Sequence, residues 1–289
     1  MKSASWSSQC EQGPGTRRTA ERTPATRPPS RTLMCILYRS RYSHMMWLHT
    51  NCERRTRMRI EMWSDIVCPI CGVTQHRLRN AVAEFDHGDE VELIHRSFQV
   101  HPGIPPEGIT QTQLSRDAGM TVARMEAILR PVEISAEAEG FGDYHAIDRT
   151  LGPTDRTHEL LAYATDQGKH HEAWVGMFKA HFGTNRQLWT VKQLVEFAGE
   201  IGLDQDEARA VLESRHYRRQ VEDEQVRAQQ MGAHGTPFIV IDGKYGIAGG
   251  VDTPALVRTM DRVWAETRPV LSMPFGEGDQ CRVGGGCAS

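Results

Sequence analysis

The sequence predicts an α/β fold in which a small mixed sheet is interrupted by a large all-helical segment. Three observations predict it: a strand–helix–strand pattern over residues 58–100, helical periodicity over 110–231, and a hairpin followed by a helix over 238–264. A right-handed strand–helix–strand unit forms a parallel pair, and the hairpin adds an antiparallel pair. We therefore expect one mixed sheet, with most helices packed as a separate subdomain.

The first unit begins with an apolar run over residues 58–67, which predicts a β-strand. Cys68-Pro69-Ile70-Cys71 follows at the start of an amphipathic run over 69–85, which predicts a helix. Pro69 suits the first helical turn, where no backbone N–H is needed. A second strand is expected over 91–100, and then a loop with three prolines over 101–108.

The middle of the chain is expected to be helical throughout, with a break at Pro131 and further breaks at glycines. Thr190 and Asp204 are expected helix N-caps, and Asp204 with Glu207 resembles a capping box. Three aromatic residues spaced four apart are expected to belong to the core: Trp174, Phe178 and Phe182.

The last unit begins with a proline, Pro237, directly before a short buried-strand pattern over 238–241. Asp242-Gly243 is a hairpin signal. Thr253-Pro254 predicts an N-cap followed by proline at the first helical position, for a helix that ends near Trp264.

Charge divides the chain into segments. Residues 1–57 carry 11 Lys/Arg and 3 Asp/Glu, a net of +8, whereas the rest of the chain has a net charge of −11. We expect 1–57 to be a disordered basic extension, with translation from Met58 favoured over a nucleic-acid arm or a targeting peptide. We expect a sheet domain over 58–108 and 233–268, a helical insertion over 109–232 and a flexible tail over 269–289.

The location expected from the sequence is cytoplasmic. No run approaches the roughly 20 apolar residues of a membrane helix. The best candidate for the apolar core of a signal peptide, over 33–48, is interrupted by Arg39, Arg41 and His44. No nucleic-acid or membrane partner is expected, and the sequence does not give the oligomeric state.

The Cys68-Pro69-Ile70-Cys71 motif is a candidate dithiol–disulfide centre. A cysteine at a helix N-terminus meets unpaired N–H groups and the positive end of the helix dipole, so its pKa falls. Cys68 is therefore the expected nucleophile, and Cys71, one turn inside, is expected to resolve the mixed disulfide. Half of a zinc site and a chance pair of structural cysteines are the alternatives, but the chain offers no second CxxC.

Thr236-Pro237 is the second candidate element of the site. A cis bond here would place the Thr236 backbone beside Cys68, where it could pair with a substrate peptide. A trans proline that starts an edge strand is an equal alternative from these residues alone.

Together the two motifs resemble the DsbA family of the thioredoxin superfamily, and more closely its cytoplasmic FrnE-like branch. The residues that carry the resemblance are Trp63-Ser64-Asp65-Ile66-Val67 before the cysteines and Gly235-Thr236-Pro237 with the strand after it. The resemblance covers about residues 58–268. It implies a thioredoxin fold with a helical insertion, dithiol oxidoreductase or isomerase activity, and no metal or organic cofactor. It also implies that Cys68 is the nucleophile, Cys71 the resolving thiol and Pro237 a cis-proline.

Two positions depart from the family pattern. FrnE-like members usually have an aromatic residue where this chain has Ile70, and periplasmic DsbA enzymes have His. Ile70 supplies neither a hydrogen bond nor a charge to the Cys68 thiolate. We therefore expect the thiolate to be less stabilised, and the cysteine couple to be less oxidising, than in a DsbA enzyme with His at this position. Met62 stands where thioredoxin-like proteins often carry a buried acid, and the sequence leaves that role unassigned between Glu61 and Asp65.

Two further cysteines, Cys281 and Cys287, lie in the Gly-rich tail. They are either a tethered dithiol that exchanges with the motif or thiols with no role.

The function expected is thiol–disulfide exchange with protein or small-molecule thiols, glutathione among the candidates. One alternative is a glutathione-dependent isomerase or transferase of the hydroxychromene-carboxylate isomerase or kappa class, whose members generally have Ser at the position of Cys68. The other is a non-enzymatic, chaperone-like binding module.

Overall fold

The computed structural model describes residues 57–268, all within one compact unit of the chain. The predicted basic extension, except Arg57, and the predicted tail lie outside the described residues. None of the helices within 57–268 is long and apolar enough to cross a membrane.

A four-stranded mixed sheet in the order β2-β1-β5-β6 forms the centre, as the sequence predicts. Its strands are β1 (Met58–Ser64), β2 (Val91–Ser97), β5 (Phe238–Ile241) and β6 (Tyr245–Ala248). β1 pairs in parallel with β2 and antiparallel with β5, so Met62 lies between His95 and Ile239. In the hairpin turn between β5 and β6, Asp242 and Gly243 have positive φ and the Lys244 N–H donates to the Ile241 carbonyl at 3.1 Å.

Both parallel strands end three residues earlier than their apolar runs predict. Residues 65–67 form a turn instead, in which the Cys68 N–H donates to the Asp65 carbonyl at 3.1 Å. The Val100 N–H donates to the Asp65 carboxylate at 2.6 Å rather than to a strand neighbour. The Asp65 turn therefore sets where the sheet stops and where the cysteines begin.

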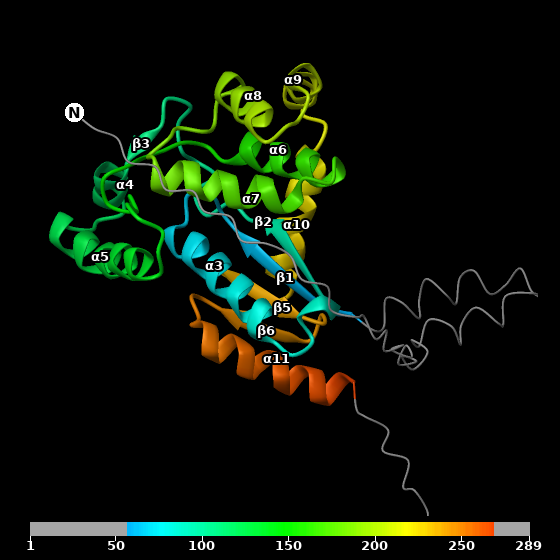
Figure 1. Cartoon of the computed structure of the whole chain (residues 1–289). Helices are drawn as coiled ribbons and strands as arrows, with labels where there is room; N and C mark the ends of the chain where they lie inside the picture. Colours follow the sequence, from blue (N-terminus) through cyan, green and yellow to red (C-terminus); the bar gives the residue numbers. More distant parts are fainter. Residues whose placement is uncertain (1–56, 269–289) are drawn as a thin grey trace, which may run out of the picture. The chain divides into compact units, whose positions relative to one another are not determined.

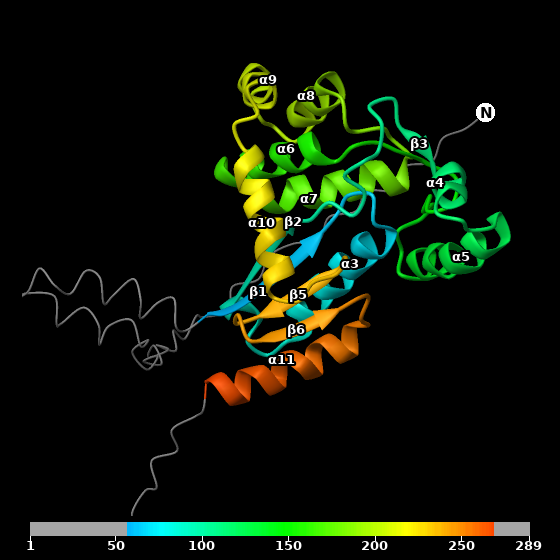
Figure 2. The ribbon, with the colours of Figure 1, turned by 180° about the vertical axis from the view of Figure 1, so that it is seen from behind.

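Helices cover both faces of the sheet. α3 (Pro69–Glu84) and α11 (Thr253–Thr267) pack together on one face, and α10 (Arg218–Gln230) crosses the other, as Figures 1 and 2 show from opposite sides. The remaining helices belong to the segment between β2 and β5: α4 (Gln111–Asp117), α5 (Val122–Ala138), α6 (Asp155–Asp166), α7 (His170–Phe178), α8 (Val191–Glu200) and α9 (Gln205–Ser214).

A continuous apolar core joins the sheet to this helical segment. One cluster of buried side chains includes Ile60 of β1, Leu78 of α3, Leu160 of α6 and Met260 of α11. The predicted core stripe is confirmed, because Trp174, Phe178 and Phe182 are all at most 3% exposed. The boundaries predicted for the sheet domain and the insertion stay predictions.

The helical segment is not helical throughout, and its break at Pro131 was wrongly predicted. A short two-stranded sheet, β3 (Ile109–Thr110) with β4 (Thr150–Leu151), lies inside it. Pro131 lies within α5 and is exposed, so water can reach the backbone carbonyl that the proline leaves without a helical donor. Residues Lys179–Gly183 form one π-helical turn after α7, followed by an irregular stretch before α8.

Two predicted caps are confirmed and two details change. Thr190 caps α8 in a full capping box with Gln193. Asp204 caps α9 by accepting from two backbone N–H groups, but the Glu207 carboxylate accepts from the Tyr163 hydroxyl instead. The last helix is capped by Asp252 rather than Thr253, because the aspartate side chain accepts from Ala255 N.

A buried carboxylate, Glu61, ties β1 to its neighbours. It forms ion pairs with Arg59, Arg96 and Arg227 and is 3% exposed. Burial raises its pKa, but the hydrogen bond from Arg227 and the three positive charges outweigh burial and hold that pKa below its usual range.

We expect Glu61→Gln to lower the free energy of unfolding by about 2 kcal/mol, because it leaves partly buried guanidinium groups without their anion. Urea denaturation at neutral pH measures the loss. Asp223→Asn on α10 is the control, since the Arg219–Asp223 pair is largely exposed and contributes at most about 0.5 kcal/mol. Equal losses in the two variants would contradict this account.

Candidate active site

The motif cysteines sit where β1 turns into α3. Cys68 is the N-cap of α3 with extended backbone angles, and Pro69 fills the first helical position. The Cys68 thiol is half-buried, whereas Cys71 has no exposed surface. Both are free thiols in this structure. The predicted placement of an accessible cysteine at the helix N-terminus and a buried one in the first turn is therefore what the structure has.

The loop before β5 brings Thr236 and Pro237 against the cysteines. The Thr236–Pro237 peptide bond is cis. The Cys68 thiol contacts the Thr236 carbonyl oxygen at 3.6 Å across 168 residues of sequence. On the other side the Pro237 carbonyl accepts from Gly249 N at 2.9 Å, which holds the loop to the end of β6.

The two thiols differ in acidity. The hydrogen bond from the Cys71 thiol is the largest cause that lowers the pKa of Cys68, and it outweighs the opposing effect of burial. Burial, the largest cause, raises the pKa of Cys71 well above its usual range, and the neighbouring Cys68 charge adds to it. Cys68 is the thiol that ionises first, and only Cys68 can meet a large substrate.

Ile70 faces solvent beside the cysteines. It is 37% exposed and lines a groove of about 260 Å³ between α3, α5 and the loop before α11. The other walls of the groove are mainly apolar: Val73, Pro131, Val132 and Gly250, with Arg77 and Ser135.

Sequence reasoning missed a buried acid–imidazole contact behind the motif. Asp65 and His158 have no exposed surface, and Asp65 Oδ1 lies 3.4 Å from His158 Nε2. The Asp65 charge raises the pKa of Cys68. Asp65 could have been predicted as part of the site because it lies three residues before Cys68 in the sequence. Nothing in the sequence around His158 indicates that it lies there.

A second missed group lies behind the first turn of α3. The Tyr144 hydroxyl donates to the Pro69 carbonyl at 2.6 Å. Arg149, which is 5% exposed, lies with its guanidinium carbon 4.8 Å from the centre of the Phe182 ring. These residues belong to a segment between α5 and α6 that has no sequence motif.

We expect acid to lower the free energy of unfolding of the protein, because the buried imidazole of His181 takes up a proton more readily in the unfolded chain. Burial first, and then the Arg149 charge, lower the pKa of His181 to about 3. A histidine in the unfolded chain has a pKa near 6.5, so between those values the unfolded state binds more protons. Stability that is complete above pH 6.5 is therefore lost as the pH falls, by about 2 kcal/mol at pH 5 from His181 alone.

Urea midpoints from pH 7 to pH 5 measure this loss. His181→Gln should flatten the dependence, whereas His101→Gln at an exposed position should leave its slope unchanged. An unchanged slope in the His181 variant would contradict the assignment.

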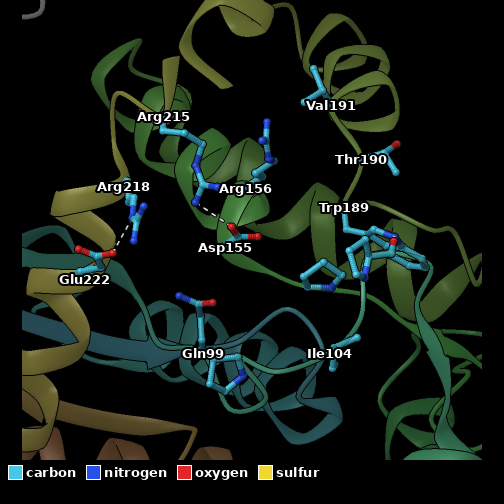
Figure 3. Close-up of a pocket in the computed structure, with 13 residues that line it drawn as sticks. Gln99, Ile104, Asp155, Arg156, Trp189, Thr190, Val191, Arg215, Arg218 and Glu222 are labelled. Carbon is cyan, nitrogen blue, oxygen red and sulfur yellow. Dashed lines mark hydrogen bonds and ion pairs between the residues drawn. The ribbon is translucent and has the colours of Figure 1, made fainter. Parts of the chain in front are cut away.

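A larger cavity, of about 670 Å³, lies between the loop after β2 and the N-terminal turns of α6, α8 and α10 (Figure 3). One side is apolar, with Ile104 and Trp189, and the other carries Arg156 and the Arg215–Asp155 ion pair. Neither cysteine lines it. Ile104 does share a buried cluster with Val67, the residue before Cys68, so the cavity adjoins the motif.

The predicted tail cysteines, Cys281 and Cys287, lie outside the described residues. The structure thus brings together Cys68, Cys71, Thr236 and Pro237, with Ile70 at the edge of the same site.

Comparison with known proteins identifies the family. The model of the DSBA-like thioredoxin domain matches residues 59–261. A solved probable DsbA oxidoreductase from Streptomyces coelicolor is 35% identical, with a TM-score of 0.69 over 73% of this chain and 91% of that one. An uncharacterised Bacillus subtilis protein, YwbO, is 26% identical over 159 residues, which are 55% of this chain and 73% of that protein.

A solved 2-hydroxychromene-2-carboxylate isomerase shares the fold alone, at 12% identity and a TM-score of 0.56, over 72% of this chain and 97% of that one. The match over residues 59–261 and the 35% identity show that the similarity extends over most of the chain and is not confined to the two motifs. The chain belongs to the DsbA-like thioredoxin domain family.

Proposed function

We propose that the protein is a thiol–disulfide oxidoreductase that exchanges disulfides with protein or small-molecule thiols through Cys68 and Cys71. The single observation that carries the proposal is the asymmetry of the two thiols. Cys68, the N-cap residue of α3, has a half-buried thiol of lowered pKa, and Cys71, one turn inside the helix, has a fully buried thiol of raised pKa.

The proposed reduction of a substrate disulfide proceeds in two displacements. The Cys68 thiolate attacks one sulfur of the substrate, a Cys68–substrate disulfide forms, and the other substrate sulfur leaves as a thiolate that takes up a proton. Cys71 then loses its proton and attacks Cys68 Sγ. The Cys68–Cys71 disulfide forms, and the second substrate thiol leaves. Two electrons pass from the dithiol to the substrate, and the reverse sequence oxidises a substrate dithiol.

The Thr236–Pro237 loop and the Ile70 groove are the proposed substrate contacts. The Thr236 backbone lies against Cys68, where an extended peptide can pair with it as an added strand. Ile70 and the apolar groove beside it suit a nonpolar side chain next to the substrate cysteine. Protein thiols, glutathione and other small thiols are the proposed partners, and the proposed location is cytoplasmic.

Two other functions remain as rivals. Because the fold is similar to that of a 2-hydroxychromene-2-carboxylate isomerase, a glutathione-dependent isomerase or transferase is one alternative. The two free thiols at the N-terminus of α3 favour redox exchange over it. Tight glutathione binding without redox turnover would favour that rival. Aggregation suppression that survives loss of both cysteines would favour a chaperone-like module.

Reductase assays with insulin and with oxidised glutathione, driven by dithiothreitol, test the proposal. The wild-type chain should accelerate both reactions over the uncatalysed rate, and Cys68→Ala should reduce the rate to that of the uncatalysed reaction. A Cys68→Ala variant that keeps full activity would refute the proposed chemistry.

A further inference from the structure

The cavity between the loop after β2 and the first turns of α6, α8 and α10 has the size of a small-molecule site. Its volume is about 670 Å³, and ligand sites in proteins commonly occupy roughly 300–1,000 Å³. Four stretches that are far apart in the sequence contribute to its lining: 99–106, 153–156, 189–191 and 215–222. Neither motif cysteine lines it. The cavity is therefore a candidate binding site in its own right.

One wall of the cavity is apolar and rigid. It consists of three prolines and three other apolar residues: Pro102, Pro106, Pro153, Ile104, Val191 and Trp189. The Trp189 indole N–H donates to the Pro106 carbonyl at 3.1 Å, and a Cβ at Gly108 would lie 2.9 Å from the ring, so the indole is held in place. Proline side chains have almost no rotamer freedom to lose. A ligand that covers this wall therefore gains apolar contact at little cost in side-chain entropy.

The other wall presents a guanidinium that no carboxylate pairs with. Arg156 donates through Nη1 to the Leu212 carbonyl at 3.0 Å, and it forms no ion pair with any residue of 57–268. The other two arginines that line the cavity do have partners: Arg215 with Asp155 at 2.7 Å and Arg218 with Glu222 at 2.8 Å. The remaining N–H groups of Arg156 are available to a ligand.

The surroundings of Arg156 favour a negative charge over a positive one. The lining contains three arginines and two carboxylates, and Glu159, which also pairs with Arg215, is buried and does not line the cavity. α6 and α10 begin here, and no side chain caps the N–H groups of their first turns. The positive ends of these two helix dipoles add to the charge of Arg156.

A neutral donor faces Arg156 from the opposite side of the cavity. The Gln99 side chain extends from the loop after β2 toward the wall that carries Arg156 and Asp155 (Figure 3). Within the part of the chain that the structure describes, this amide group has no hydrogen-bond partner. Its N–H₂ can therefore donate to the same group of a ligand as Arg156.

We propose that this cavity binds a small organic anion with an apolar body, of the class of aromatic or branched carboxylates. The apolar body lies against the proline-rich wall, and the anionic group accepts from Arg156 and Gln99. A neutral molecule of the same shape binds more weakly, because charge-assisted hydrogen bonds are roughly twice as strong as neutral ones. The proposal does not depend on the thiol chemistry, since neither cysteine lines the cavity.

Fluorescence titration of the full-length chain with anilinonaphthalene sulfonate tests the proposal, because this dye joins an apolar aromatic body to an anionic group. The control probe is phenylnaphthylamine, which has the same rings without the sulfonate. Phenylacetate should displace the anionic dye from the wild type, whereas phenylacetamide, which has the same ring and no charge, should not.

Substitutions of the lining separate the anionic contact from the apolar one. Arg156→Gln should raise the dissociation constant of the sulfonate dye about tenfold and leave that of the neutral probe unchanged. Arg156→Lys should keep most of the affinity, and Gln99→Glu should weaken only the sulfonate dye. Val191→Phe should weaken both probes, because the larger side chain fills part of the cavity. Arg124→Gln, at an exposed position on α5, is the matched control and should change neither.

Equal affinity of the sulfonate dye for Arg156→Gln and the wild type, with both folded by circular dichroism, would overturn the proposal. So would a wild-type chain that does not bind the dye, an equal loss in Arg124→Gln, or an equal loss of the neutral probe in Arg156→Gln. If Arg156→Gln does not fold, Gln99→Glu decides, and an unchanged affinity for the sulfonate dye would then overturn the proposal. Dye bound elsewhere, for example on the basic segment 1–57, is the same in every variant, so only differences between variants count.

Discussion

Replacing Cys71 with Ser should turn the protein into a trap for its own substrates. Cys68 keeps its place at the α3 N-terminus, so the first displacement still occurs. Release from the mixed disulfide then depends on an external thiol. A well-placed intramolecular nucleophile reaches an effective molarity of about 10⁵ M, so release by about 1 mM external thiol should be slower by orders of magnitude, up to about 10⁸-fold.

The trap is measured with glutathione disulfide in the background that lacks the five cysteines outside residues 57–268. Mass spectrometry should find one glutathione adduct on Cys68 in the Cys71→Ser variant and no lasting adduct in the parent. Adding back Cys281 and Cys287 decides between the two interpretations of the tail, because a Cys68–tail disulfide forms only if the tail exchanges with the motif. An adduct that clears from Cys71→Ser as fast as from the parent would contradict the role of Cys71.

Adding one methyl group at Gly152 should unfold the segment that carries the larger cavity. A Cβ at this position would lie 1.9 Å from the indole of Trp189. Trp189 is 7% exposed, and its indole N–H donates to the Pro106 carbonyl at 3.1 Å, so the ring has little freedom to move. We expect Gly152→Ala to cost about 3 kcal/mol or more, at the upper end of overpacking.

Gly103→Ala is the matched control for Gly152→Ala. It lies in the loop near the same cavity, has no atom within 4 Å of an added Cβ and does not have a positive φ. Its urea midpoint should equal that of the wild type. A Gly152→Ala midpoint equally close to the wild type would show that Trp189 is free to move aside.

The sheet and the thiol centre could be predicted because short stretches of sequence determine them. The Asp242-Gly243 turn after a short apolar run predicts the hairpin, and Pro69 directly after Cys68 predicts the start of α3. The family resemblance then favoured a cis Pro237, which the residues alone left open, and the structure confirms that bond.

The surroundings of the thiols could not be predicted, since they depend on contacts between distant segments. Tyr144 reaches Pro69 across 75 residues of sequence, from the stretch between α5 and β4 that has no helical or strand period. The helix break predicted at Pro131 was wrong for a local reason. On an exposed part of α5, water can hydrogen-bond to the backbone carbonyl that loses its helical donor, so the helix tolerates the proline.

The central claim is that Cys68 and Cys71 form one two-electron couple. Equilibration of the chain lacking the other five cysteines in glutathione buffers of stepped ratio, followed by acid quenching and mass spectrometry, measures it most directly. The account predicts a single transition in which the protein loses two hydrogens and the disulfide maps to the peptide that contains both Cys68 and Cys71. Glutathionylated Cys68 beside a reduced Cys71 across the whole range would contradict it.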